Sequence, residues 1–254
     1  MRIGTSLCPG PSTGVPSGIC FQPQKPTHSS TATEPVPPGE RLHRFSGAGR
    51  GDSLALMTTP TRDQLLVEAE NLIRRGGYSA FSYAHLTEKI GITKASIHYH
   101  FPTKQRLAEE VVDLAQARFA EALKGIEAEN TLVADQLHQY AMLFLDGFEA
   151  SLRPLCGALS AELAALPPSL HERTAAYFRL HLDWLTRVLE KGITAGELQW
   201  TNGSAALARL LLSTLEGGSL IGRALGSRED VLQGFEQVLA LAGAPAVQKI
   251  GTSL

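Results

Sequence analysis

The chain has 254 residues, of which 43% are hydrophobic, and it carries 23 basic and 25 acidic side chains. This length suffices for one large or two small domains with a buried core, and the net charge of −2 argues against a protein that binds polyanions over its whole surface. The three cysteines, Cys8, Cys20 and Cys156, are odd in number and widely spaced, which disfavours a disulfide framework or a metal site and favours a cytoplasmic protein. The sequence shows no signal peptide and no long apolar run, which argues against a membrane partner.

Residues 1–57 differ in composition from the rest, because they hold eight of the 14 prolines and eight glycines. Such a segment cannot bury enough apolar surface to offset the entropy lost on ordering. We expect it to be disordered or an over-extended gene start, since Met57 directly precedes the first helical pattern. A transit peptide is the alternative, which the few basic residues before Glu34 disfavour.

From residue 58 onward, apolar residues recur at three- and four-residue spacing, which predicts an all-α fold. The first helix begins near Thr61 and stops at Gly76-Gly77. Ser82 is the predicted N-cap of a short second helix that ends at Gly91, a residue suited to a tight turn. A third short helix follows at once, so the spacing is typical of a helix-turn-helix.

The third helix, capped by Thr93 and running from Lys94 to about His100, is too polar for a core helix. Ile97 and Phe101 fall on one inward face, four residues apart. The other side chains offer hydroxyl, ammonium, imidazole and phenol groups, the mixture that a recognition helix uses on base edges and phosphates. These candidate DNA-binding residues are Thr93, Lys94, Ser96, His98, Tyr99 and His100.

A fourth helix is predicted to start after Thr103, with Lys104 in its first turn. A cation at that position opposes the helix dipole, so its placement needs an external reason. A DNA phosphate bound at the helix N-terminus provides one.

Residues 61–112 resemble the DNA-binding domain of the TetR family of transcriptional repressors. The resemblance is carried by Gly-Gly-Tyr, Phe-Ser-Tyr-x-x-Leu and the run from Ile90 to Lys104. It implies that the third helix faces DNA, that Lys104 binds a backbone phosphate, and that Ser82 and Tyr83 touch phosphate from the second helix. Two departures are Ala95, where glycine is commoner, and His98, where the family usually has tyrosine. Each histidine taken alone also fits a solvated surface group.

The charge of the chain is uneven, with +2 in residues 1–57, +1 in residues 58–110 and −5 in residues 111–254. The near-neutral total therefore averages a weakly basic DNA-binding segment with an acidic remainder. We expect a DNA-binding domain over residues 58–108, an effector-binding and dimerisation domain over residues 109–246, and a tail over residues 247–254. The modest charge predicts weak non-specific binding and dependence on two DNA-binding domains acting together.

Further helices are predicted in the acidic part. The fourth helix continues through Leu123, a fifth covers Leu137 to Phe148, a sixth covers Leu155 to Ala164, a seventh runs from Pro167-Pro168 to about Gly192, and two more span about Asn202–Leu225 and Glu229–Ala242. In the TetR family the last two long helices form a homodimer interface. The resemblance thus implies a homodimer on a pseudo-palindromic operator.

Two kinds of effector site are compatible with the body helices. Aromatic side chains at helical spacing can line an apolar pocket, although such stripes are more often core: Tyr140, Phe144, Phe148, Tyr177, Phe178 and Trp184. Cys156 follows Pro154 at a helix start and has Arg153 nearby, which predicts a lowered thiol pKa. The stretch around Cys156 resembles a branch of TetR-like repressors that sense electrophiles; the alternative is a buried cysteine packing as a small hydrophobe.

The sequence thus predicts a ligand-responsive DNA-binding regulator, most often a repressor in this family, released by a small apolar molecule or by thiol modification. We expect no cofactor and no metal. The alternatives are a helical interaction protein without DNA binding and an enzyme, for which no nucleophile, metal-ligand or phosphate-loop motif is found.

Overall fold

The computed structural model describes residues 61–244, all of which fall within one compact unit. Across these residues the secondary structure is helical without strands, which confirms the all-α fold class. The predictions for residues 1–57, for Cys8 and Cys20 and for the tail lie outside the described residues. Between residues 61 and 244, no helix has the length and apolar character needed to cross a membrane.

The first three helices form the predicted helix-turn-helix arrangement, with bounds α1 (Thr61–Gly76), α2 (Tyr83–Ile90) and α3 (Lys94–His100). Helix α1 stops where Gly77 adopts a positive φ of 95° and donates its amide to the Ile73 carbonyl at 2.8 Å. Helix α2 ends in the same way at Gly91, with φ 75°. Residues with a Cβ rarely adopt this backbone conformation, so both glycines define the turns.

The predicted N-caps are partly confirmed. The Thr93 hydroxyl accepts the amide of Ser96 at 3.2 Å and the Thr103 hydroxyl accepts the amide of Arg106 at 3.1 Å. Ser82 lies at the N-cap position of α2 with extended backbone, but its side chain makes no capping hydrogen bond. The two threonine caps fix where α3 and the next helix begin.

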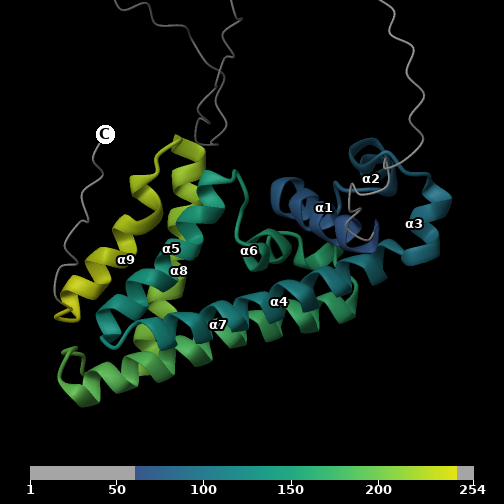
Figure 1. The fold of residues 1–254 in the computed structure, drawn as a ribbon. Helices are drawn as coiled ribbons and strands as arrows, with labels where there is room; N and C mark the ends of the chain where they lie inside the picture. The colour runs from purple at the N-terminus through teal and green to yellow at the C-terminus, as the bar shows by residue number, and fades with distance from the viewer. Residues whose placement is uncertain (1–60, 245–254) are drawn as a thin grey trace, which may run out of the picture. The chain divides into compact units, whose positions relative to one another are not determined.

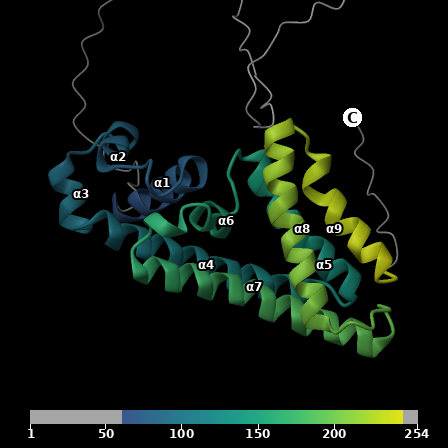
Figure 2. The ribbon, with the colours of Figure 1, turned by 180° about the vertical axis from the view of Figure 1, so that it is seen from behind.

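The remaining elements are α4 (Lys104–Glu129), α5 (Val133–Glu149), α6 (Leu155–Ser160), a 3₁₀ turn (Leu163–Ala165), α7 (Pro168–Ala195), α8 (Ser204–Leu225) and α9 (Glu229–Leu241). Figures 1 and 2 show α4 and α7 lying side by side, with α1 to α3 at the start of α4 and α8 packed against α9. The predicted sixth helix is shorter than expected: α6 ends at Ser160, and the Glu162 side chain just beyond it accepts a hydrogen bond from the α1–α2 loop.

Two hydrophobic clusters are joined by α4. The proximal core comprises buried residues of α1 to α3, the first half of α4, α6 and the start of α7, including Leu65, Ile97, Phe101, Val112 and Leu170. The distal core comprises buried residues of the second half of α4, α5, the second half of α7, α8 and α9, including Leu123, Leu137, Leu189, Leu211 and Phe235. Phe119 and Phe178 pack against both cores, so the DNA-binding helices and the body share one packed interior.

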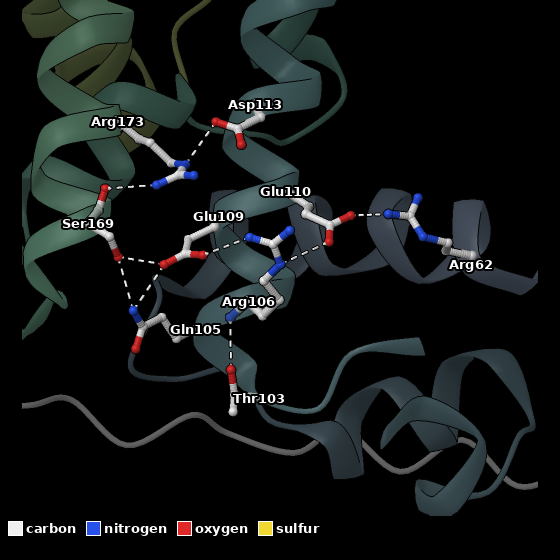
Figure 3. A network of polar contacts seen from close by, with 9 residues as sticks. All are labelled: Arg62, Thr103, Gln105, Arg106, Glu109, Glu110, Asp113, Ser169 and Arg173. Carbon is white, nitrogen blue, oxygen red and sulfur yellow. Dashed lines mark hydrogen bonds and ion pairs between the residues drawn. The ribbon is translucent and has the colours of Figure 1, made fainter. Parts of the chain in front are cut away.

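A polar network ties the start of α4 to α1 and α7 (Figure 3). The buried Glu109 carboxylate accepts hydrogen bonds from Ser169 Oγ at 2.5 Å and from Gln105 Nε2 at 3.0 Å. Next along α4, Glu110 pairs with Arg62 of α1. These bonds hold the N-terminal half of α4 between the two neighbouring helices.

A Glu109→Gln variant tests this network. The Ser169 and Gln105 hydrogen bonds lower the pKa of Glu109, so its ionised form stabilises the fold above the carboxyl's ordinary pKa and this contribution is lost as pH falls through the lowered value. We expect the variant to lose about 1 kcal/mol of unfolding free energy at pH 7, in urea denaturation, and the deficit to shrink below about pH 4. Glu121→Gln, on the exposed side of α4, is the control and should match the wild type. An equal deficit at all pH values would contradict the assignment.

Candidate DNA-binding surface and effector cavity

Helix α3 presents a polar outer face on an apolar base. Ile97 is fully buried, as is Phe101 directly after the helix, and both belong to the proximal core. Tyr99 is 85% exposed, which is unusual for an aromatic side chain, and its ring meets that of neighbouring His100 edge to face with centroids 5.2 Å apart. Of the other candidate contacts, Thr93, Lys94 and His98 are exposed, and Ser96 and His100 are partly exposed. The six predicted side chains, on α3 and at its N-cap, are therefore all at least partly accessible to solvent.

Tyr83 of α2 has a structural partner. Its hydroxyl donates to the Phe101 carbonyl at 2.7 Å, and burial raises the pKa of Tyr83 to about 12, so the group remains a donor. Its ring meets His98 edge to face with centroids 4.9 Å apart, and His98 Nδ1 lies 3.2 Å from the Pro102 carbonyl oxygen. Tyr83 thus holds the C-terminal end of α3 in place, while its predicted phosphate contact, like that of partly exposed Ser82, stays a prediction.

Lys104, in the first turn of α4, is held by contacts within the protein itself. Its ammonium lies 4.5 Å from the centre of the Tyr78 ring and 4.7 Å from that of Phe81, within reach of a cation–π interaction with both. Burial lowers the pKa of Lys104, and the Glu162 carboxylate nearby opposes that shift. The aromatic α1–α2 loop therefore positions the ammonium that we predicted to bind phosphate.

Glu162, which the sequence analysis did not single out, connects α6 to the DNA-binding helices. Its carboxylate accepts the backbone amide of Ser79 at 2.7 Å. A side chain at Gly77 would collide with this carboxylate, so glycine is needed there for room as well as for its positive φ. No local sequence signal marks the contact, because Ser79 and Glu162 are 83 residues apart.

A cavity of about 250 Å³ lies where six helices meet. It is lined from α1 by Glu70 and Arg74, from α4 by Ala115, Arg118 and Phe119, from α5 by Leu143, Phe144 and Gly147, from α6 and the residue before it by Pro154, Leu155 and Cys156, from α7 by Tyr177 and His181, and from α8 by Glu216. One wall thus belongs to a DNA-binding helix and the others to the body. A pocket with an aromatic lining and a few converging polar groups is the usual form of a small-molecule site.

The predicted effector residues divide between cavity and core. Phe144, Tyr177 and Cys156 line the cavity, whereas Tyr140, Phe148, Phe178 and Trp184 are not among the lining residues. Tyr140 is fully buried and shares a 2.8 Å hydrogen bond with His181 Nδ1, which belongs to the wall. Trp184 is buried in the distal core and donates its indole N–H to Glu127 at 2.8 Å.

Two aromatic rings of the wall were not predicted. Phe119 of α4 stacks on His181 of α7 with ring centroids 4.1 Å apart. Burial lowers the pKa of His181 to about 3, so the imidazole is neutral at physiological pH and behaves as a flat polar ring. The pairing of Phe119 with α7 is a tertiary contact, which the helical period of the sequence does not reveal.

The charged groups of the wall differ in how well they are paired. Glu70 is buried and pairs with Arg74 at 3.3 Å and with Arg118 of α4. Arg74 also donates to the Arg153 carbonyl at 2.7 Å. Among the described residues nothing donates a hydrogen bond to Glu216 Oε1, although that atom is buried. Burial raises the pKa of the Glu216 carboxyl to about 7.

The predicted lowering of the Cys156 thiol pKa is wrong. Cys156 is buried, with 2% of its surface exposed, and burial together with the nearby Glu216 carboxylate raises its pKa well above the ordinary value. Helix α6 has six residues, too few for a strong dipole. Arg153 is bonded elsewhere, since its Nε donates to the Arg74 carbonyl at 3.0 Å, and it is not among the groups that shift the pKa of the Cys156 thiol. Cys156 is therefore a protonated thiol in the cavity wall.

Comparison with known proteins agrees with this arrangement. Residues 65–111 match the family model described as bacterial regulatory proteins of the tetR family. A TetR-family transcriptional regulator from Agrobacterium tumefaciens has a crystal structure with a TM-score of 0.69 and 32% sequence identity, covering 71% of this chain and 96% of that one. The crystal structure of a TetR regulator from Legionella pneumophila gives a TM-score of 0.67 at 27% sequence identity, and the match covers 74% of this chain and 100% of that one.

A more distant curated relative is the nucleoid occlusion factor SlmA of Marinomonas sp. (strain MWYL1), 23% identical over 157 residues, which are 61% of this chain and 79% of the relative. The match to the Agrobacterium regulator spans the helix-turn-helix and the body together. Regulators of this kind bind DNA, act as dimers and are not enzymes. The chain belongs to the TetR family of transcriptional regulators.

Proposed function

We propose that this protein is a ligand-responsive repressor that binds a pseudo-palindromic operator as a homodimer and leaves it when a small molecule occupies the cavity. The observation that carries the proposal is the composition of the cavity wall, in which Glu70 and Arg74 of α1 face the body helices. An occupant would therefore contact the DNA-binding helices and the body at once. Such a protein works where the chromosome is, in the cytoplasm of a bacterium.

The DNA contact is proposed for the outer face of α3. Exposed Lys94 and Tyr99 supply a cation and an aromatic hydroxyl to the major groove, and the Thr93 hydroxyl lies at the N-terminal end of the helix. Lys104 is proposed to bind a backbone phosphate from its place beside the Tyr78 and Phe81 rings. These positions support a division of roles in which α3 reads the base sequence and Lys104 of α4 positions the protein on the DNA backbone.

The homodimer is proposed to form through α8 and α9. In the described chain these helices carry several large exposed apolar side chains, at Leu210, Leu220, Ile221, Leu225 and Leu241. Four of them lie on α8 and Leu241 ends α9, and exposed apolar side chains concentrated on one pair of packed helices are typical of a protein interface. A two-fold dimer places two copies of α3 on the same side, as successive half-sites of an operator require.

The effector is proposed to bind reversibly, with release following from a shift between two conformations. It must bind the DNA-incompetent conformation more tightly, since equal affinity for both shifts nothing. In that conformation α4 would move relative to α1 and separate the two recognition helices beyond about 34 Å, the spacing of successive major grooves. Thiol modification at Cys156 is the alternative trigger, which the buried, protonated thiol disfavours.

Fluorescence anisotropy with DNA from upstream of the protein's own gene tests the DNA contact. Lys94→Ala should weaken binding about 10-fold and change sequence preference, and Lys104→Ala should weaken binding to all sequences and reduce the logarithmic salt dependence by about 1. Lys124→Ala, an exposed lysine far along α4, should bind as the wild type does. Wild-type protein that binds all DNA sequences equally would contradict the proposed operator recognition. Wild-type protein that binds no DNA would favour an interaction protein without DNA binding.

Light scattering coupled to size-exclusion chromatography tests the interface. The wild type should elute as a dimer at micromolar concentration, and Ile221→Glu should give a folded monomer, because it places a charge within the proposed apolar interface. Leu132→Glu is a matched control, since Leu132 is 52% exposed and Ile221 is 54% exposed. A monomeric wild type, or a dimer that tolerates Ile221→Glu, would contradict the assignment.

The rate of thiol labelling separates the two triggers. In a Cys8→Ser, Cys20→Ser background, Cys156 should react with a chromogenic disulfide reagent at least about 10-fold more slowly in the folded protein than in denaturant, because the thiol is buried and protonated. Equally fast labelling, together with operator release that a Cys156→Ser change abolishes, would establish thiol modification instead.

A further inference from the structure

The cavity contains one acidic group without a partner. Glu216 of α8 lines the cavity with its carboxylate against Gly157 of α6, and its Oε1 is buried with no hydrogen bond from any described residue. Leaving a buried acceptor unsatisfied costs about 1–3 kcal/mol, and more for a charge. A group that donates to Glu216 from within the cavity would remove that cost.

The other charges of the wall are already engaged. The Glu70 carboxylate pairs with both Arg74 and Arg118, and Arg74 also donates to a backbone carbonyl. An anionic occupant would have to compete with Glu70 for these cations and would meet the unpaired Glu216. The electrostatics of the wall therefore favour an occupant that brings positive charge.

The space around Glu216 is shaped by small and aromatic residues. A side chain at Gly157 of α6 would collide with Glu216 Oε2, so the glycine leaves room for the carboxylate. Phe119, Phe144 and Tyr177 supply aromatic rings to the same wall. Ring faces attract cations as well as other aromatic groups, and a volume of about 250 Å³ suits a molecule with one ring and a short side chain.

We propose that the cavity selects an aromatic amine in its protonated form, with the ammonium donating to Glu216 and the ring packing against Phe119, Phe144 and Tyr177. This inference rests on the proposed function only in taking the cavity as the effector site. It assigns the class of ligand, and it makes Glu216 the residue that discriminates an ammonium from a neutral or anionic head group.

Isothermal titration calorimetry with three probes of one skeleton tests this selection on the full chain. The probes are phenethylammonium, phenethyl alcohol and phenylacetate, which present a cationic, a neutral and an anionic group at the same distance from the ring. At pH 8 we expect phenethylammonium to bind at least about 10-fold more tightly than the alcohol, and phenylacetate to bind most weakly. Equal binding of ammonium and alcohol, or tightest binding of phenylacetate, would overturn the proposal.

Variants assign the preference to Glu216. Glu216→Gln should abolish the advantage of the ammonium over the alcohol, and Gly157→Ala, which displaces the carboxylate, should reduce it. Glu190→Gln removes a charge from the exposed side of α7 and should change nothing. An ammonium preference that survives both Glu216→Gln and Gly157→Ala would overturn the assignment.

The pH dependence gives a second readout. Because the pKa of Glu216 is about 7, its charge is present at pH 8 and mostly absent at pH 6. The ratio of the affinity for phenethylammonium to that for phenethyl alcohol should therefore increase as the pH is raised from 6 to 8. The groups facing Glu216 do not titrate there, since burial raises the pKa of Cys156 on α6, Tyr140 on α5 and Tyr177 on α7, and lowers that of His181 on α7 to about 3. The remaining charged groups of the wall are Glu70 and its two partners, Arg74 and Arg118. A constant advantage would overturn the role of Glu216.

Operator binding, measured in parallel by anisotropy, keeps the two proposals separate. A chain that binds its operator but shows no ammonium preference would overturn the ligand class and leave the repressor function standing. A chain that prefers the ammonium but binds no operator would overturn the repressor function and leave the ligand class standing.

Discussion

The fold depends on one continuous helix that is built into two hydrophobic cores. The first half of α4 contributes Leu107, Val111 and Val112 to the proximal core, and its second half contributes Leu123 and Ile126 to the distal core. Since a helix transmits displacement along its axis and packed side chains yield little, the helix-turn-helix cannot reorient without a change in how α4 packs on α1 or α7. The α4 contacts therefore decide the orientation of α3.

The cavity lies at the junction of the two cores, where packing is incomplete and charges are buried. Phe119 contacts both cores and stacks on His181, while Arg118 in the preceding position pairs with Glu70 of α1. Glu162 adds a second connection, from the end of α6 to the loop that holds Lys104. An occupant at the junction thus contacts the residues that fix α4 against α1.

Local signals in the sequence predicted the helices and their ends well, because caps and turn glycines act within a few residues: Thr93, Thr103, Gly77 and Gly91 do so in the structure. The α3 surface was predicted for the same reason, since its outward residues belong to one short helix. The cavity was predicted only in part. Phe144, Tyr177 and Cys156 line it, but Glu216 and Glu162 act through partners distant in sequence, and the thiol pKa depends on burial, which local pattern does not reveal.

The central claim is that occupancy of the cavity changes the spacing of the two recognition helices through α4. Pulsed electron paramagnetic resonance measures this spacing directly, between spin labels at Glu88→Cys on the exposed face of α2 in a dimer whose native cysteines are replaced by serine. With operator bound, the label distribution should be narrow and consistent with recognition helices about 34 Å apart. Saturating phenethylammonium should move it to longer distances, whereas an unchanged distribution with the cavity occupied would contradict the account.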